Sequence, residues 1–321
     1  MERLIEPKLL IGAVILIAVV ITSGIVYVAL TPSSNTIIMY TTTSTDNSGL
    51  LQYLEPMWEK ATGINVKWVP VGTGAAIQSA EQGEADVVMV HARSLEDQFV
   101  NAGYGFHRVS LMHNDFVLVG PASDPAGVNG MANATQVFQK LYHFLSNQTL
   151  NPKYNIKFES RGDDSGTNVK ELTLWNESGI HIDDSNKTWA DANSWYSSLG
   201  AGMGKTLTTT GEQNSYTLTD RATFLKLSTS SSGLPLTILA QNSTSDTWAN
   251  PYGVILVNPA AFPNLNIKMD LAKRYVEWLI SNQGQAAINA YKINHKQVFF
   301  ADFQNLKSEL NSTELAFWGL S

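Results

Sequence analysis

The chain has 321 residues, a net charge of -7 and no cysteine, and 44% of its residues are hydrophobic. This mild acidity argues against a nucleic-acid partner, because nucleic-acid-binding proteins need a basic face. The absence of cysteine excludes disulfides, thiolate metal sites, cysteine nucleophiles and a lipid-modified cysteine, so any attachment to a membrane must use a helix.

The first predicted element is a membrane anchor at residues 9–30. This run carries no charged residue and is long enough to span a hydrocarbon core of about 30 Å. Arg3 and Lys8 precede it, which keeps residues 1–8 in the cytoplasm and places the rest outside. A cleaved signal peptide is the alternative, but its apolar core is usually only about 7–15 residues long. With residues 31–35 as a polar spacer, we expect a single-pass protein of the cell membrane with an extracellular C-terminal domain.

Asn-X-Ser/Thr acceptor sequences predict glycosylation of an exported chain. Any one of them arises easily by chance, but together they support the outward topology. Their asparagines are Asn133, Asn147, Asn176, Asn186, Asn242 and Asn311.

Short β-prone runs at residues 37–40, 64–69 and 86–90 alternate with helical segments. After the first run, Thr-Thr-Thr-Ser-Thr-Asp-Asn-Ser-Gly at residues 41–49 precedes a helix that ends at Gly63. We expect its buried side to carry Leu50, Leu51, Leu54, Met57 and Trp58. After the second run, Gly-Thr-Gly at residues 72–74 precedes a helix at 75–82.

Such strand–turn–helix repeats predict parallel strands joined by right-handed crossovers. Ligands of these sheets bind at the carboxyl ends of the strands, where the turns lie. The sequence therefore places Thr43, Ser44 and Thr73 along one edge of one domain. Simple capping of the helices by serine or threonine is the alternative role for these residues.

Two long extended runs, at residues 114–121 and 252–257, predict that the chain crosses twice between two lobes. The part between them has its own helices, at residues 134–145 and 167–175. After the second crossing we expect a helix at 269–280 and a last helix at 286–291. The prediction is an α/β fold of two lobes joined by a hinge, with lobe I at residues 36–119 and 251–321 and lobe II at 120–250.

The strongest candidate for a binding site is Ser-Arg-Gly-Asp-Asp-Ser-Gly-Thr at residues 160–167, between an extended run and a helix. Free N–H groups and two hydroxyls at a helix start favour an anion. Arg161 adds a cation with several donors. We expect Asp163 and Asp164 to orient the guanidinium or face solvent, since bare carboxylates would repel an anion. Taken alone, the segment fits an ordinary helix cap beside a surface Arg–Asp pair equally well.

Other patterns carry no chemistry. The glycines at residues 200–206 lack the spacing of a phosphate-binding loop, because Leu199 occupies the position of the first glycine, and we predict a flexible loop there. The histidines lack metal-site spacing and are taken as structural. Arg221 is expected to pair with Asp220 or face the cleft, with a structural role favoured. No nucleophile motif or acid/base pair is found, so no enzyme, cofactor or metal site is predicted.

The motifs together resemble the TupA family, the tungstate-binding components of ABC importers. They fall in the family's order, at residues 41–49, 72–74, 112–121, 160–167, 202–204 and 216–221. His113 and Ala222 depart from the family pattern of Tyr and Gly, at positions that should not touch the anion. The resemblance covers nearly everything after the spacer. The membrane anchor replaces the usual signal peptide or lipid, as an archaeal-type cell surface would need.

The resemblance implies a type II periplasmic-binding-protein fold that closes on an oxyanion between its lobes. The implied ligand contacts are Thr43, Ser44, Thr73, Arg161, Ser165, Gly166 and Thr167, supported by Asp163, Asp164 and Arg221. The expected partners are an ABC permease and its ATPase, and the protein is expected to be a monomer. Molybdate is the alternative ligand, because its size and geometry are nearly the same. A ligand-sensing ectodomain or an enzyme on the same fold is the less favoured alternative.

Overall fold

The computed structural model describes residues 35–152, 155–229, 233–242 and 245–320. The predicted anchor at residues 9–30 lies outside the described residues, as do residues 1–8 and most of the spacer. In the part of the chain that the structure describes, no helix is both long and apolar enough to cross a membrane. The rest of this section concerns the α/β unit that begins at Ile37.

Among the described residues, the main sheet has eight strands, six of them in the order β12-β4-β9-β3-β1-β2, while β7 and β8 pair with β4. Strands β1 and β3 are parallel, as the strand–turn–helix pattern predicts. Strand β9 is antiparallel to both β3 and β4, so the sheet is mixed. The strands are β1 (Thr36–Thr42), β2 (Asn65–Val71), β3 (Val87–Val90), β4 (Gly105–Gly120), β7 (Thr217–Asp220), β8 (Thr237–Ala240), β9 (Ala249–Val257) and β12 (Phe300–Ala301).

The apolar run in β3 is buried on both faces, because β3 lies between β1 and β9 and helices cover the sheet on each side. Side chains alternate along a strand. Val87 and Met89 therefore enter one hydrophobic cluster, while Val88 and Val90 enter another. The first cluster includes side chains of α3 (Leu50–Thr62) and α11 (Met269–Ile280), and the second includes side chains of α4 (Thr73–Glu81) and α5 (Arg93–Asn101).

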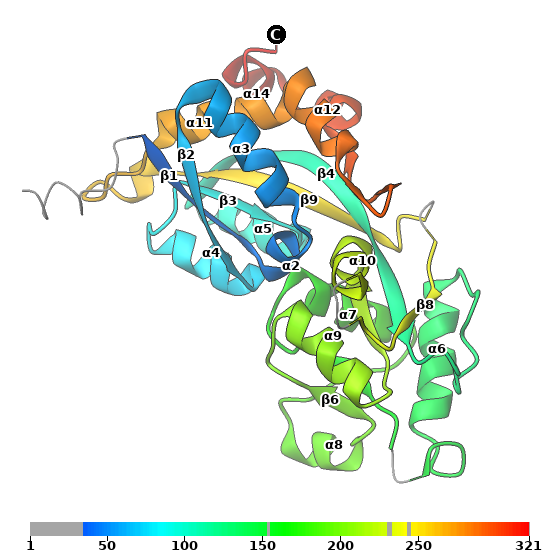
Figure 1. Ribbon diagram of the computed structural model, residues 1–321. Coiled ribbons are helices and arrows are strands. Elements are labelled where there is room, and N and C mark those ends of the chain that lie inside the picture. The colour runs from blue at the N-terminus through cyan, green and yellow to red at the C-terminus, as the bar shows by residue number, and fades with distance from the viewer. Residues whose placement is uncertain (1–34, 153–154, 230–232, 243–244, 321) are drawn as a thin grey trace, which may run out of the picture. The chain divides into compact units, whose positions relative to one another are not determined.

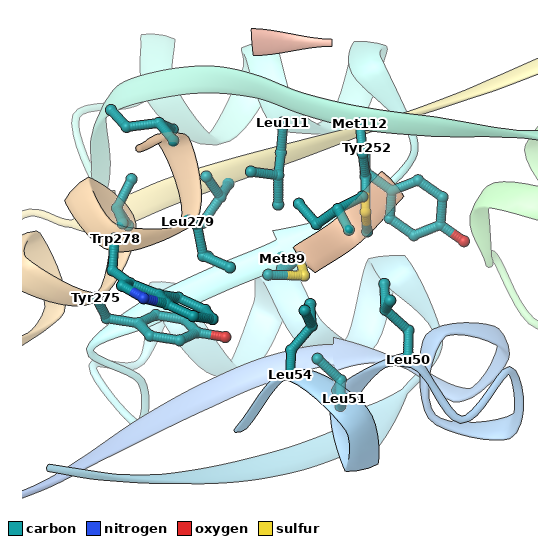
Figure 2. Packing of buried hydrophobic residues seen from close by; sticks show 14 of the residues in the cluster. Leu50, Leu51, Leu54, Met89, Leu111, Met112, Tyr252, Tyr275, Trp278 and Leu279 are labelled. Carbon is teal, nitrogen blue, oxygen red and sulfur yellow. The ribbon is translucent and has the colours of Figure 1, made fainter. Parts of the chain in front are cut away.

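Figure 2 shows the first cluster, with leucines of α3 on one side of Met89 and side chains of β4 on the other. The predicted stripe of α3 is correct except for Met57, which is 36% exposed. Glu55 is buried instead, and its carboxyl accepts a hydrogen bond from Tyr275 of α11. The buried face of α3 is therefore turned toward Glu55, and Met57 lies at its edge.

Strand β4 is the longer of the two predicted crossings. Its first part pairs with β9, from Gly105 to Asp115, and its end pairs with β7 and β8. The two crossing strands run side by side (Figure 1). A separate hydrophobic cluster, drawn from residues 116–248, packs beyond the point where β4 leaves β9. This distribution fits two lobes, whose boundaries stay a prediction.

Helix α6 (Ala134–Leu145) matches its predicted range, and α7 (Gly166–Glu177) begins one residue before its predicted start. The loop predicted at residues 200–206 is wrong, because strand β6 (Tyr196–Ser198) leads into helix α9 (Met203–Glu212). Along α9, the hydroxyls of Thr206, Thr208 and Thr210 donate to carbonyl oxygens four residues earlier, at 2.8–3.2 Å. Such bonds satisfy the hydroxyls but slightly destabilise a helix. The packing of Met203 and Leu207 in a hydrophobic cluster is therefore what stabilises this threonine-rich helix.

The chain does not end in a helix at residues 286–291. Helix α12 (Asn282–Ala290) begins earlier, because Ser281 Oγ accepts from the N–H of Gly284 at 3.2 Å and caps it. The remaining elements are α2 (Thr43–Asn47), β5 (Phe158–Ser160), α8 (Lys187–Ala192), α10 (Arg221–Ser228), η2 (Pro259–Ala261), β10 (Lys292–Ile293), β11 (Lys296–Gln297), α13 (Phe303–Leu306), η3 (Lys307–Glu309) and α14 (Ser312–Phe317).

Candidate functional site

The three predicted hydroxyl- and glycine-rich segments meet at one place. Arg161 Nη2 donates to Thr43 Oγ1 at 3.0 Å, and the N–H of Gly166 donates to Thr73 Oγ1 at 3.1 Å. Thr43, Thr73 and Gly166 are the first residues of α2, α4 and α7. Helix starts favour negative charge, because their first N–H groups have no partner within the helix. The structure therefore brings together segments that are far apart in the sequence.

Arg161 is the cation of this cluster, and its side chain is only 1% exposed. Nη2 donates to Asp163 Oδ2 at 2.6 Å as well as to Thr43 Oγ1, so the Asp163 carboxylate lies against the guanidinium. Among the described residues, Nε and Nη1 have no hydrogen-bond partner. Burial lowers the pKa of Arg161, while Asp163 and Asp220 raise it, and a guanidinium stays charged in proteins. The cluster thus has a buried positive charge with two donors available.

Ser165, Gly166 and Thr167 form the start of α7 beside this guanidinium. Ser165 Oγ caps the helix by accepting from the N–H of Asn168 at 3.2 Å. The buried hydroxyl of Thr167 has no partner among the described residues. A Cβ on Gly166 would stand 2.5 Å from the carbonyl oxygen of His91, so only glycine fits there. The segment therefore combines available donors with a close approach of backbone.

Ser44 and Thr42 supply hydroxyls on the opposite side. Thr42 caps α2, accepting from the N–H of Thr45 at 3.2 Å. Ser44 Oγ lies 2.9 Å from Thr42 Oγ1 and 3.0 Å from Nε2 of His91. Both hydroxyls are buried. Capping accounts for Thr42, but the position of Ser44 beside a buried histidine goes beyond what a cap needs.

A fourth helix start, that of α9, also reaches this cluster. A Cβ on Gly202 would lie 3.3 Å from Thr43 Oγ1, and no side chain caps α9. The sequence prediction missed this helix because it treated the surrounding glycines as a loop.

The other two predicted supporting residues, Asp164 and Arg221, form hydrogen bonds with other groups than Arg161. Asp164 is exposed, and its carbonyl oxygen accepts from the N–H of Gly74 at 3.2 Å. Arg221 does not pair with Asp220: its Nε donates to Asp115 Oδ2 at 3.2 Å. The carboxylate of Asp220 is unavailable to Arg221 because it caps α10 by accepting from the N–H of Thr223 and points into the interior.

Sequence reasoning also missed buried polar residues behind Arg161. Asp220 Oδ1 accepts from Asn114 Nδ2 at 3.1 Å, and Asn114 Oδ1 accepts from Asn250 Nδ2 at 2.7 Å. Tyr252 and His91 pack together, with ring centroids 4.7 Å apart. These residues follow or lie on strands that look purely structural in the sequence. The available signal was their position near strand ends, where ligands of such sheets bind.

Glu171 supports the segment from behind. Its carboxylate accepts from Tyr196 OH at 2.8 Å and from Trp175 Nε1 at 3.0 Å, and also from the hydroxyl of Ser160, the residue before Arg161. Burial raises the pKa of Glu171 to about 7, although these hydrogen bonds oppose the rise. Glu171 thus fixes the strand end from which Arg161 projects.

Replacing Glu171 with glutamine is expected to change how stability depends on pH. The raised pKa means that the folded state keeps a proton that the unfolded state loses between about pH 4.5 and 7, so the parent loses stability as the pH rises through this window. Glu171→Gln has no carboxyl to ionise at this position, so its stability should not fall for this reason. Denaturant melts at pH 5 and pH 8 should show the parent falling relative to the variant by about 1–3 kcal/mol.

The exposed Glu177→Gln on the same helix is the control and should show no such change. An equal difference between the parent and Glu171→Gln at both pH values would contradict the raised pKa.

Among the residues that the structure describes, no group of three or more His, Cys, Asp or Glu side chains could hold a metal ion. The cluster around Arg161 instead offers N–H groups, hydroxyls and one guanidinium, which together suit an anion with several oxygen atoms.

Comparison with known proteins places this arrangement among binding proteins. A family model described as a PBP superfamily domain matches residues 29–283. The tungstate-binding protein TupA of Peptoclostridium acidaminophilum is 42% identical over 266 residues, which cover 81% of this chain and 83% of that protein.

Solved structures give the same picture. The tungstate-binding protein TupA of Desulfovibrio alaskensis G20 is 39% identical, with a TM-score of 0.65, and the match covers 84% of this chain and 99% of that one. The tungstate ABC transporter structure from Geobacter sulfurreducens is 38% identical, with a TM-score of 0.67, and the match covers 81% of this chain and 100% of that one. The α/β fold described above is shared with both.

Proposed function

Because the chain belongs to the PBP superfamily and, within it, to the TupA family of tungstate-binding proteins, we propose that it binds tungstate for an ABC importer. The family consists of binding proteins rather than enzymes. In this proposal the protein takes up the anion outside the cytoplasm and delivers it to a membrane permease, and an ATPase drives the import.

The observation that carries the proposal is the buried guanidinium of Arg161, whose Nε and Nη1 have no partner among the described residues. Tungstate is a tetrahedral dianion whose oxygens accept hydrogen bonds and donate none at neutral pH. Desolvating such a charge is costly, so a site needs many prearranged donors. We propose that these come from Thr43, Ser44, Thr73, Arg161, Ser165, Gly166 and Thr167.

We also propose that the site forms by closure of two lobes. The hydrogen bonds from Arg161 to Thr43 and from Gly166 to Thr73 join residues 120–250 to residues 36–119. Donors from both segments reach one anion only when the segments are this close. Tungstate would then favour the closed state, and the permease would recognise that state.

At the cell surface, we propose residues 9–30 as an uncleaved anchor of a monomeric protein whose folded part lies outside an archaeal-type cell. Of the sequon asparagines, Asn133, Asn186 and Asn311 are exposed at helix starts and suit glycan attachment. Asn176 is unsuitable, because the hydroxyl of Ser178 in its sequon is buried and donates to the carbonyl oxygen of Leu174 at 2.7 Å.

Calorimetric titration of the purified full-length chain in detergent tests the ligand. We expect one tungstate per chain, and we expect sulfate and phosphate to compete at least about 100-fold less well, which corresponds to about 3 kcal/mol. Competition by molybdate at equal strength would favour the alternative ligand. Absence of binding to all four oxyanions would refute the proposal.

A further inference from the structure

Asp220 is a buried acid at the same strand edge as Arg161. Strands β5 and β7 run parallel where Phe158 bridges Tyr216, and the N–H of Glu159 donates to the carbonyl oxygen of Tyr216 at 2.8 Å. Strand β5 ends one residue before Arg161, and β7 ends at Asp220. The carboxyl ends of neighbouring parallel strands lie together, where ligands of such sheets bind. Asp220 therefore belongs to the anion site.

One oxygen of the Asp220 carboxyl is fully bonded and the other is not. Oδ1 accepts from the N–H of Thr223 at 2.9 Å and from Asn114 Nδ2 at 3.1 Å. Oδ2 is buried and has no hydrogen-bond partner among the described residues. The Thr223 hydroxyl lies beside the carboxyl, but it gives its single hydrogen to the carbonyl oxygen of Ser44 at 3.0 Å. Oδ2 therefore receives no hydrogen, whereas a proton on Oδ2 would have the Thr223 oxygen as its acceptor.

In the described part of the chain, Arg161 is the only charged side chain that acts on Asp220. Tyr252 of β9 also faces Asp220, and burial raises the pKa of this tyrosine, so it stays neutral. His91, on which Arg161 also acts, is neutral because burial and that charge lower its pKa to about 3. The other ionisable side chains on the elements packed around β7 and α10 interact with other groups or are exposed: Asp46, His113, Asp115, Glu159, Lys170, Glu171, Glu177, Lys205, Glu212, Arg221, Lys226 and Lys292.

A bound dianion would give this cluster an excess of negative charge if Asp220 were ionised. The guanidinium of Arg161 is already paired with Asp163 at 2.6 Å. An ionised Asp220 and tungstate would both add negative charge to a buried region without adding a cation, which is costly. Burial raises the pKa of Asp220, although the N–H of Thr223 and the charge of Arg161 oppose the rise. An approaching anion raises this pKa further, because like charges disfavour the ionised form.

We propose that Asp220 carries a proton whenever the site holds its oxyanion, so that binding takes up a proton from solvent onto Oδ2 at any pH where the empty site has lost it. Tungstate stays a dianion, and the added proton offsets part of its charge. This inference rests on the proposed function and adds a proton to what the site binds. Affinity is therefore highest below the pKa of Asp220 in the empty site and falls as the pH rises above it.

Calorimetric titration of the full-length chain with tungstate at pH 6, 7, 8 and 9 tests the proposal. The affinity of the parent should fall by up to about tenfold per pH unit above the empty-site pKa of Asp220. Asp220→Asn resembles the protonated acid, because asparagine is uncharged and still caps α10. It should bind within about threefold of the parent at pH 6 and about tenfold or more tightly than the parent at pH 9, with little change between.

Asp86→Asn is the matched control. Asp86 is also buried and also accepts from backbone N–H groups, those of Ile38 at 2.8 Å and Lys268 at 2.7 Å, but it precedes β3 and so lies at the opposite end of that strand from the site. This variant should keep the parental dependence of affinity on pH.

Infrared spectra of the tungstate complex at pH 7 report the proton directly. The parent should show the carbonyl band of a protonated carboxyl group that is absent from Asp220→Asn and present in Asp86→Asn. Glu171→Gln should also keep this band, which distinguishes it from that of the other buried acid near the site.

An ionised Asp220 in the tungstate complex at pH 7, or an equal dependence of affinity on pH in the parent and Asp220→Asn, would overturn the inference. If Asp220→Asn fails to fold, the shift of the carboxyl band on labelling the aspartates of the parent and of Asp86→Asn with 13C decides. A parent that binds no tungstate would refute the proposed function. A parent that binds tungstate without the protonated band would refute only the role of Asp220.

Discussion

Replacing Arg161 with alanine is expected to weaken tungstate binding by about 3–5 kcal/mol, as is typical when one member of a buried charge pair is removed. The change deletes the only cation in the described cluster and the Nε and Nη1 donors that have no other partner there. Arg161→Lys should fall between alanine and the parent, because a lysine ammonium keeps the charge but lacks the planar set of donors.

The measurement is calorimetric titration of the parent and both variants with tungstate, alongside thermal melts without ligand. Arg93→Ala is the control: its side chain is 58% exposed and pairs with Asp97 on the surface, so its loss should leave affinity unchanged. Parental affinity in a folded Arg161→Ala would mean that the anion binds elsewhere.

Gly166→Ala is expected to weaken tungstate binding by about 100-fold, because the added methyl group would meet backbone that cannot rotate away. Its Cβ would stand 2.5 Å from the carbonyl oxygen of His91, so the start of α7 could no longer approach the strand end after β3. The hydrogen bond from the N–H of Gly166 to Thr73 would be lost with that approach. The unliganded protein should stay folded, because the two segments can separate.

Titration combined with small-angle X-ray scattering checks this expectation. Tungstate should make the parent more compact and should leave Gly166→Ala unchanged at the same concentration. Gly204→Ala is a closely matched control, because its Cβ would make only an ordinary contact of 3.4 Å with Asn47, across the same pair of segments. Compaction of Gly166→Ala at parental tungstate concentrations would show that the liganded state does not need the close approach.

Much of the fold could be predicted because local pattern and tertiary packing agree. The apolar run of β3 was recognisable because both faces of that strand are buried. Helices α6 and α11 match their predicted ranges because their apolar stripes coincide with the faces they bury. The anion segment was recognisable from its sequence Ser165, Gly166 and Thr167. Serine is a typical helix cap, and glycine is typical where the backbone closely approaches another part of the chain.

Three of the failures have a common cause, since each depended on a distant partner. Helix α9 was missed because glycine and threonine disfavour helices, and its hydrophobic cluster includes side chains of β4 and α10. Arg221 was expected to pair with Asp220 or to face the cleft, whereas its acceptor is Asp115, 106 residues away. His91 was set aside for the same reason: its contact with Ser44 spans 47 residues, and no local spacing reveals it.

The position of β9 affects how the chain is made. In the sheet, β9 lies between β3 and β4, yet residues 121–248 separate it from β4 in the sequence. During synthesis, β3 and β4 therefore each present an open edge until residue 257 of 321 has been added. Open apolar edges invite pairing with other chains. The newly made N-terminal part is thus open to pairing with other chains until most of the polypeptide has been translated.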